Sequence, residues 1–220
     1  MPSSVDLTVL FEAVAAVLVQ EQDSLNRADD TNQDHGDHMV EIFQIAVRAA
    51  SEKRGADLAD AMQSASEQLR LLQGNGSAQV YARGLSLLAE QFRSRRVRLE
   101  ELVPYVQAYL HPEREQTRLH PEQTGEEERS KARSAEILKA MLSALADWER
   151  AENGQAEANG SLDMGYLFGV GMAYLQAKQR GGDRTQVLAE TVVSASPLGR
   201  LPHRHRSGML VVTSLLQAME

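Results

Sequence analysis

Side chains with oxygen atoms that could bind a metal ion are concentrated in one short stretch of this chain. Residues 25–39 read LNRADDTNQDHGDHM and surround one glycine, Gly36, just ahead of an amphipathic segment. Carboxylate and amide oxygens are the ligands that Mg²⁺ prefers in proteins, commonly alongside the phosphates of a bound nucleotide. We therefore expect Asn26, Asn32 and Asp34 to hold a magnesium ion, with the amides of a helix start beyond Gly36 available to phosphate.

A simpler interpretation of this stretch needs no metal. The acids would solvate a connection between two helices, and Asp34 would cap the second helix, whose first turn favours negative charge. His35 would then be a hydrogen-bonding loop residue and not a phosphate contact.

The same stretch resembles the magnesium loop of the nucleotide-binding L subunit (DhaL) of dihydroxyacetone kinases, and of the related domain of fatty-acid kinases. That loop has Asn or Asp followed by Asp-x-Asp-x-Gly-x-Asn-Met, and the dihydroxyacetone-kinase branch has a histidine at the place of His35. In this chain the corresponding residues are Asn26, Asn32, Asp34, Gly36, His38 and Met39. One carboxylate of the pair and the asparagine before methionine are therefore replaced.

Three further stretches resemble the family's motifs, in the family's order. Residues 74–81, GNGSAQVY, resemble its Gly/Ser-rich phosphate turn, with Ser77 kept and Ala78 in place of a glycine. Residues 182–185, GDRT, resemble its Gly-Asp-Lys/Arg-Thr signature, although Leu188 stands in the continuation where the family has an acid. Residues 203–208, HRHRSG, correspond to its His-x-Asp-Pro-Gly segment; Gly208 is kept and Arg206 replaces the acid.

The resemblance implies a site for ADP or ATP with Mg²⁺. Its cofactor contacts would be His35, Gly36, Met39, Ser77, Ala78, Gly182, Asp183, Thr185, Arg206 and Gly208. Phosphoryl transfer depends on positioning and charge neutralisation more than on a side-chain nucleophile, so no catalytic residue is assigned. The simpler interpretations are that Ser77 is a helix cap and that residues 202–206 form an exposed basic loop.

The composition of the chain argues against several classes of binding partner and site. A net charge of −8 and a pI near 5.3 argue against general affinity for nucleic acid or an anionic membrane. The chain has no cysteine, so a thiolate metal site and a disulfide framework are excluded. No apolar run is long enough to cross a bilayer, which makes the cytoplasm the expected location. A homodimer is compatible with the sequence.

Apolar residues recur at helical spacing through most of the chain, separated by glycines. We expect about eight helices in an antiparallel, all-α bundle, forming a single domain over residues 1–220 and closed like a barrel as the resemblance implies. Residues 111–160 exceed what the resemblance requires. We interpret them as an insertion, in which a polar loop precedes a capping box at residues 124–127 and a long helix toward Arg150.

Two functions follow from the resemblance. The first is a magnesium-dependent phosphotransferase domain that acts with a separate substrate-binding (DhaK-like) subunit, because the chain is too short to contain one. The second is a catalytically silent binding or regulatory module that keeps the fold, which the departures at Asn32, His38, Leu188 and Arg206 favour. A plain helical protein with accidental motif matches is a third interpretation, and the conserved order of the four stretches argues against it.

Overall fold

The fold is entirely helical in the part of the chain that can be described. The computed structural model describes residues 6–95, 106–107, 140–151 and 164–219, and no strand occurs among them. The helices are α1 (Leu7–Arg27), α2 (His35–Glu52), α3 (Leu58–Arg70), α4 (Gly76–Arg95), α8 (Met164–Arg180), α9 (Arg184–Ser194), the 3-10 helix η1 (Pro197–Gly199) and α10 (Pro202–Ala218). Residues 140–151 are also helical. The predicted all-α bundle is confirmed.

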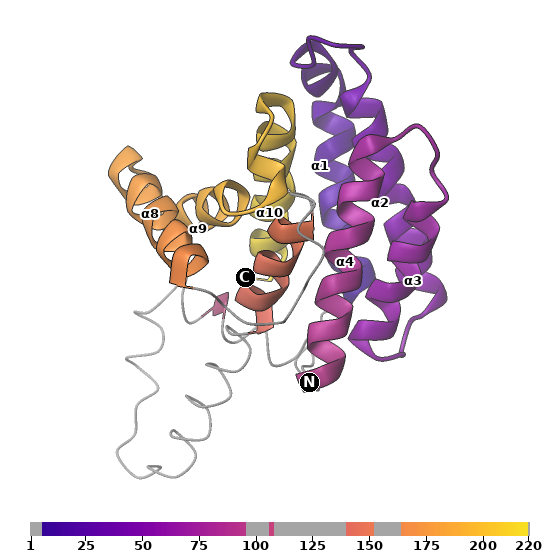
Figure 1. The fold of residues 1–220 in the computed structure, drawn as a ribbon. Helices are drawn as coiled ribbons and strands as arrows, with labels where there is room; N and C mark the ends of the chain where they lie inside the picture. The colour runs from indigo at the N-terminus through magenta and orange to yellow at the C-terminus, as the bar shows by residue number, and fades with distance from the viewer. Residues whose placement is uncertain (1–5, 96–105, 108–139, 152–163, 220) are drawn as a thin grey trace.

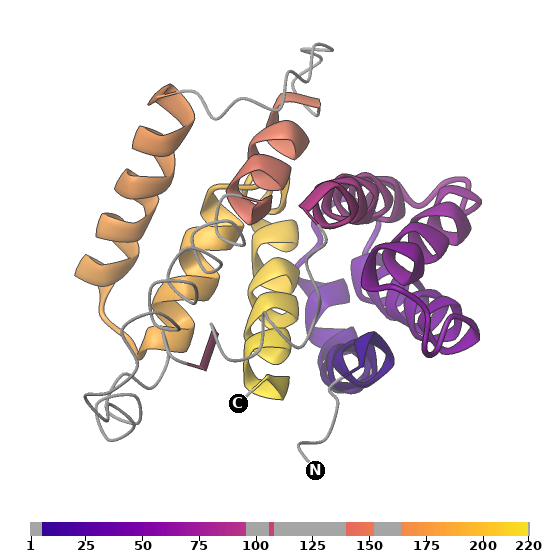
Figure 2. The ribbon, with the colours of Figure 1, turned by 90° about the horizontal axis from the view of Figure 1, so that it is seen from below.

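Helices α1 to α4 pack side by side, and α10 joins them along α1 (Figure 1). Helix α9 packs on α10, and α8 packs on α9 at the outer edge. Seen from below, α1 to α4 are viewed nearly end-on, whereas α8, α9 and α10 lie closer to the plane of the view (Figure 2). The last three helices therefore cross the first four, and α10 is the element that connects the two groups.

The core explains why α1 and α2 form a tight pair. Leu10, Val14 and Leu18 recur on one face of α1 and are almost completely buried, as are Met39 and Ile42 of α2. Apolar residues at this spacing form one stripe along a helix, which is stable only when another element covers it.

An aromatic series connects this helix pair to α4. The ring of Phe43 lies edge-to-face against Phe11 on α1 and against Tyr81 on α4, with centroid separations of 6.0 and 5.6 Å. Such edge-to-face contacts add to the stabilisation from burial alone. Tyr81 is thereby held in a fixed position at the end of the bundle where α4 begins.

Residues 140–151 pack against α4 through Trp148. A Cβ added to Gly84 would lie 3.1 Å from the Trp148 ring, so the glycine allows the indole to approach α4 closely. This segment is the described part of the helix predicted to run toward Arg150. The predicted capping box and most of the predicted insertion lie outside the described residues.

Candidate functional site

Three of the four predicted stretches meet at one end of the bundle, the end at which α2, α4 and α10 begin (Figure 1). His35 Nε2 lies 2.9 Å from Ser207 Oγ, and the rings of His35 and His203 are 4.8 Å apart between centroids. Asn75 Nδ2 donates a hydrogen bond to the carbonyl oxygen of His38 at 3.3 Å. The connection before α2, the turn before α4 and the start of α10 are therefore direct neighbours.

Asn26, the first predicted metal ligand, caps helix α2 from the end of α1. Its Oδ1 accepts hydrogen bonds from the backbone amides of Gly36 at 2.6 Å and Asp37 at 3.2 Å. Its Nδ2 donates to the Asp37 carboxylate at 2.8 Å. Helix α2 begins at His35, so the expectation of a start beyond Gly36 is wrong by two residues. The Asp37 amide, which was expected to be open to phosphate, is already bonded.

Gly36 serves the contact between α1 and α2. A Cβ at this position would lie 2.1 Å from the backbone carbonyl oxygen of Gln22, a distance that no side chain tolerates. The residue is buried in the first turn of α2. The glycine is therefore required by close helix packing, independently of any ligand.

Asn32 and Asp34, the other two predicted metal ligands, do not cap α2 as Asn26 does. Asn32 is exposed, and Asp34 lies at the N-cap position of α2 without forming a side-chain capping bond. The Asp34 carboxylate instead lies 3.3 Å from His38 Nδ1. Among the residues described, no group of three or more His, Cys, Asp or Glu side chains is arranged to hold a metal. Magnesium binding stays a prediction.

His35 lies at the buried centre of the three turns, with only 3% of its surface exposed. Ser207 Oγ donates its proton to the carbonyl oxygen of Arg204 at 3.0 Å, so it accepts the hydrogen bond from His35 Nε2. Burial, followed by the positive charge that His203 can carry, lowers the pKa of His35 from 6.5 to about 4. His35 is therefore neutral at pH 7, with its proton on Nε2.

Asp29 is a buried acid at the end of the bundle where α2 begins. Burial alone would raise its pKa, but the hydrogen bond from the Thr31 amide and the nearby His203 and His35 side chains lower it overall. The carboxylate is thus ionised and bonded to its own loop. It holds the connection between α1 and α2 in shape.

Helix α4 is capped by Asn75 and not by Ser77, so the predicted cap is wrong. Asn75 Oδ1 accepts a hydrogen bond from the amide of Ala78 at 2.9 Å, because α4 begins one residue before Ser77. Ser77 and Ala78 are both buried. Ser77 lines a small enclosed space together with His35, Met39, Val80, Tyr81, Leu198, Arg204 and Ser207.

Residues 203–208, expected to form a loop, are the first two turns of α10. Pro202 occupies the first helical turn, where its missing amide and fixed φ are favourable. Arg206 is half exposed and approaches α1, where it bonds to Ser24 Oγ and lies 3.9 Å from the Glu21 carboxylate. Gly208 is buried against Leu198 and Val193, so it serves core packing.

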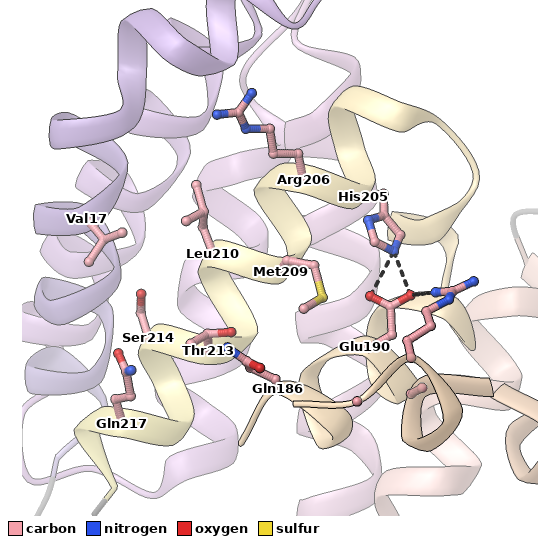
Figure 3. Close-up of a pocket in the computed structure, with 13 residues that line it drawn as sticks. Val17, Gln186, Glu190, His205, Arg206, Met209, Leu210, Thr213, Ser214 and Gln217 are labelled. Carbon is pink, nitrogen blue, oxygen red and sulfur yellow. Dashed lines mark hydrogen bonds and ion pairs between the residues drawn. The ribbon is translucent and has the colours of Figure 1, made fainter. Parts of the chain in front are cut away.

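The fourth predicted stretch, residues 182–185, borders a different face of α10. Asp183 accepts a hydrogen bond from the amide of Gln186 at 2.8 Å and caps α9. This turn borders an open groove of about 620 Å³ lined by α1, α8, α9 and α10 (Figure 3). There the Glu190 carboxylate pairs with Arg180 and with His205. Gly182, Asp183 and Thr185 thus lie by this groove, and not in the cluster around His35.

Two residues outside the set of expected cofactor contacts also belong to the cluster: Tyr81, in the predicted phosphate turn, and Arg204, in the basic run at residues 202–206. Both have a buried polar atom, the Tyr81 hydroxyl and Arg204 Nε, without a hydrogen-bond partner in the described part of the chain. Burial raises the pKa of Tyr81, so its hydroxyl keeps its proton and is a donor. The alternation of histidine and arginine at residues 203–206 was the available signal for Arg204.

Comparisons with protein-family models, with curated proteins and with solved structures each find no match to this chain. Among the described residues, no helix has the length and apolar character needed to span a membrane. The function is therefore argued from the site itself.

Proposed function

We propose that this protein is a nucleotide-binding module, similar to the L subunit of dihydroxyacetone kinases, that binds the phosphates of ADP or ATP without transferring a phosphoryl group. The observation that carries the proposal is the meeting of three helix starts, those of α2, α4 and α10, around His203 and Arg204. The first turn of a helix presents a positive dipole end and those backbone amides that no side chain caps, and both favour phosphate.

The loop chemistry favours binding over catalysis. Phosphoryl transfer requires metal ions or equivalent charges that neutralise the transferred group. Asn26 is engaged by α2 through both of its side-chain atoms, and Asn32 lacks the charge of the aspartate it replaces. A site with this donor set provides less charge for two cations than the family's loop does.

A magnesium-dependent phosphotransferase that acts with a separate substrate-binding subunit is the second candidate. Its supporting observation is the exposure of Asn32 and the partial exposure of the Asp34 side chain at the start of α2. In this case the metal, and not the protein's own cations, would hold the nucleotide phosphates.

Thermal unfolding with millimolar ADP or ATP, in EDTA or in Mg²⁺, separates the candidates. A ligand that binds only the folded state raises stability, by about 2.7 kcal/mol at a hundred times its Kd. We expect both nucleotides to raise the Tm in EDTA and in Mg²⁺, and no ADP to form from ATP. A Tm rise that requires Mg²⁺ and is lost in Asp34→Asn would favour the phosphotransferase. No rise under any condition would contradict both.

A further inference from the structure

Arg204 occupies an electrostatically unbalanced position. Its Nη2 would lie 3.5 Å from a Cβ added to Gly76, the first residue of α4, so the guanidinium lies over the start of that helix. Arg204 itself belongs to the first turn of α10. A positive charge near the start of a helix is unfavourable, because the dipole gives that end a partial positive charge. Two helix starts and one cation therefore share a small region.

Acidic side chains do not balance this charge in the part of the chain described. Neither α4 nor α10 has an acid in its first turn, and no side chain caps α10. The nearby Asp29 bonds to the Thr31 amide, and Glu41 is exposed and lies 3.3 Å from Asn75 Nδ2. No ion pair joins either carboxylate to Arg204 among the described residues. An anion from solution would supply the missing negative charge.

Tyr81 provides a second, independent indication of a ligand. Its side chain is only 9% exposed, and its hydroxyl and Arg204 Nε are buried donors without an acceptor in the described part of the chain. A buried donor left unbonded costs about 1–3 kcal/mol. The enclosed space that Tyr81 and Arg204 line has no room for a water molecule. Water in this space therefore does not satisfy the two donors.

We propose that Arg204, with His203 and the amide ends of α4 and α10, binds a diphosphate or triphosphate group directly, without a bridging metal ion. The inference rests on the proposed nucleotide-binding function and names the group that is recognised. A guanidinium suits this role because its planar donors match the oxygens of a phosphate in pairs. Direct cation pairing would also allow a chain with Asn32 in place of an aspartate to bind phosphate.

Calorimetric titration of the full chain with sodium pyrophosphate in EDTA tests the proposal. We expect wild-type protein to bind, Arg204→Gln to bind at least about tenfold more weakly, and Arg204→Lys to lie between them. Arg93→Gln is the control, because Arg93 is an exposed arginine near the other end of α4 and pairs with Asp60. We expect this control to stay within about twofold of wild type, since exposed surface pairs contribute little. Circular dichroism of each variant verifies folding.

The outcomes separate this inference from the function on which it rests. Binding of ADP with Mg²⁺, but no binding of pyrophosphate in EDTA, would overturn direct recognition and leave the nucleotide-binding proposal intact. No binding of either ligand would overturn both. Equal weakening by Arg204→Gln and Arg93→Gln would indicate general attraction to positive charge and would also overturn the inference. An unfolded Arg204→Gln leaves the decision to Arg204→Lys, which must bind more weakly than wild type.

Discussion

Asn26 supplies the capping hydrogen bond that the residues at the start of α2 do not form themselves. Asp34 occupies the N-cap position of α2 without a capping bond, and Asn26 supplies that bond from the preceding helix. Replacing a capping side chain by alanine typically costs about 1 kcal/mol and up to about 2. We expect Asn26→Ala to lower the free energy of unfolding by this amount in urea denaturation.

Asn32→Ala is the matched control for that measurement. Asn32 lies in the same connection but is exposed, so its removal should change stability by less than about 0.5 kcal/mol. Equal effects of the two substitutions in metal-free buffer would contradict the assignment of Asn26 as a cap.

The buried His35 makes folding sensitive to acid. Its pKa is about 4 in the folded protein and 6.5 as an ordinary value, so the unfolded chain binds a proton more readily between these limits. The free energy of unfolding therefore decreases as the pH falls from 6.5 toward 4. The total decrease from this group is on the order of 3 kcal/mol. The lowered pKa of Asp29 adds a further loss only below its ordinary value of 3.8.

Comparison of the unfolding free energy of wild type and His35→Gln across this pH range tests the effect. We expect the wild-type curve to fall more steeply than that of the variant between pH 6.5 and 4. Parallel curves would show that His35 does not titrate differently in the two states.

At this scale the sequence predicted ligand contacts for residues whose contacts in the structure are with other parts of the chain. Asn26, Gly36 and Gly208 were assigned from their places in motifs, yet their structural contacts are with a helix amide, a carbonyl oxygen and the core. Those contacts depend on how α2 packs against α1 and how α10 packs against η1. A residue's type and spacing do not carry that information.

At the scale of helices, the close approach of α1 and α2 sets the geometry of the site. We expect Gly36→Ala to destabilise the protein by about 1–3 kcal/mol or more, because the added Cβ meets the backbone of Gln22, which cannot move alone. Gly169→Ala on α8 is the control, since nothing lies within 4 Å of its Cβ position. That substitution should be neutral or stabilising by about 0.5–1 kcal/mol. Similar losses in both variants would contradict the packing argument.

Helix existence was more predictable than helix starts. The apolar stripes of α1 and α2 are visible in the sequence, whereas α4 begins before its expected cap and α10 includes a segment expected to be a loop. Asn75 and Ser77 are both good capping residues, so type alone does not decide between them. Pro202 was a usable signal for the start of α10, because proline favours the first helical turn.

For the whole molecule, three of the four stretches expected to form one nucleotide site meet, and the fourth does not. Residues near 35, 77 and 204 are joined at one end of the bundle, whereas residues 182–185 border the groove on another face of α10. The order of motifs along the chain does not specify how α8 and α9 pack on α10. The barrel-like closure expected from the resemblance stays a prediction.

The most direct test of the central claim is titration of isotope-labelled protein with ADP, followed by the backbone amide signals in NMR spectra. We predict the largest chemical-shift changes at Ser77, His203 and Arg204, smaller changes at His35, and little change at residues 182–185. Shifts confined to residues 182–185 and the groove, or no shifts at millimolar ADP, would contradict this claim.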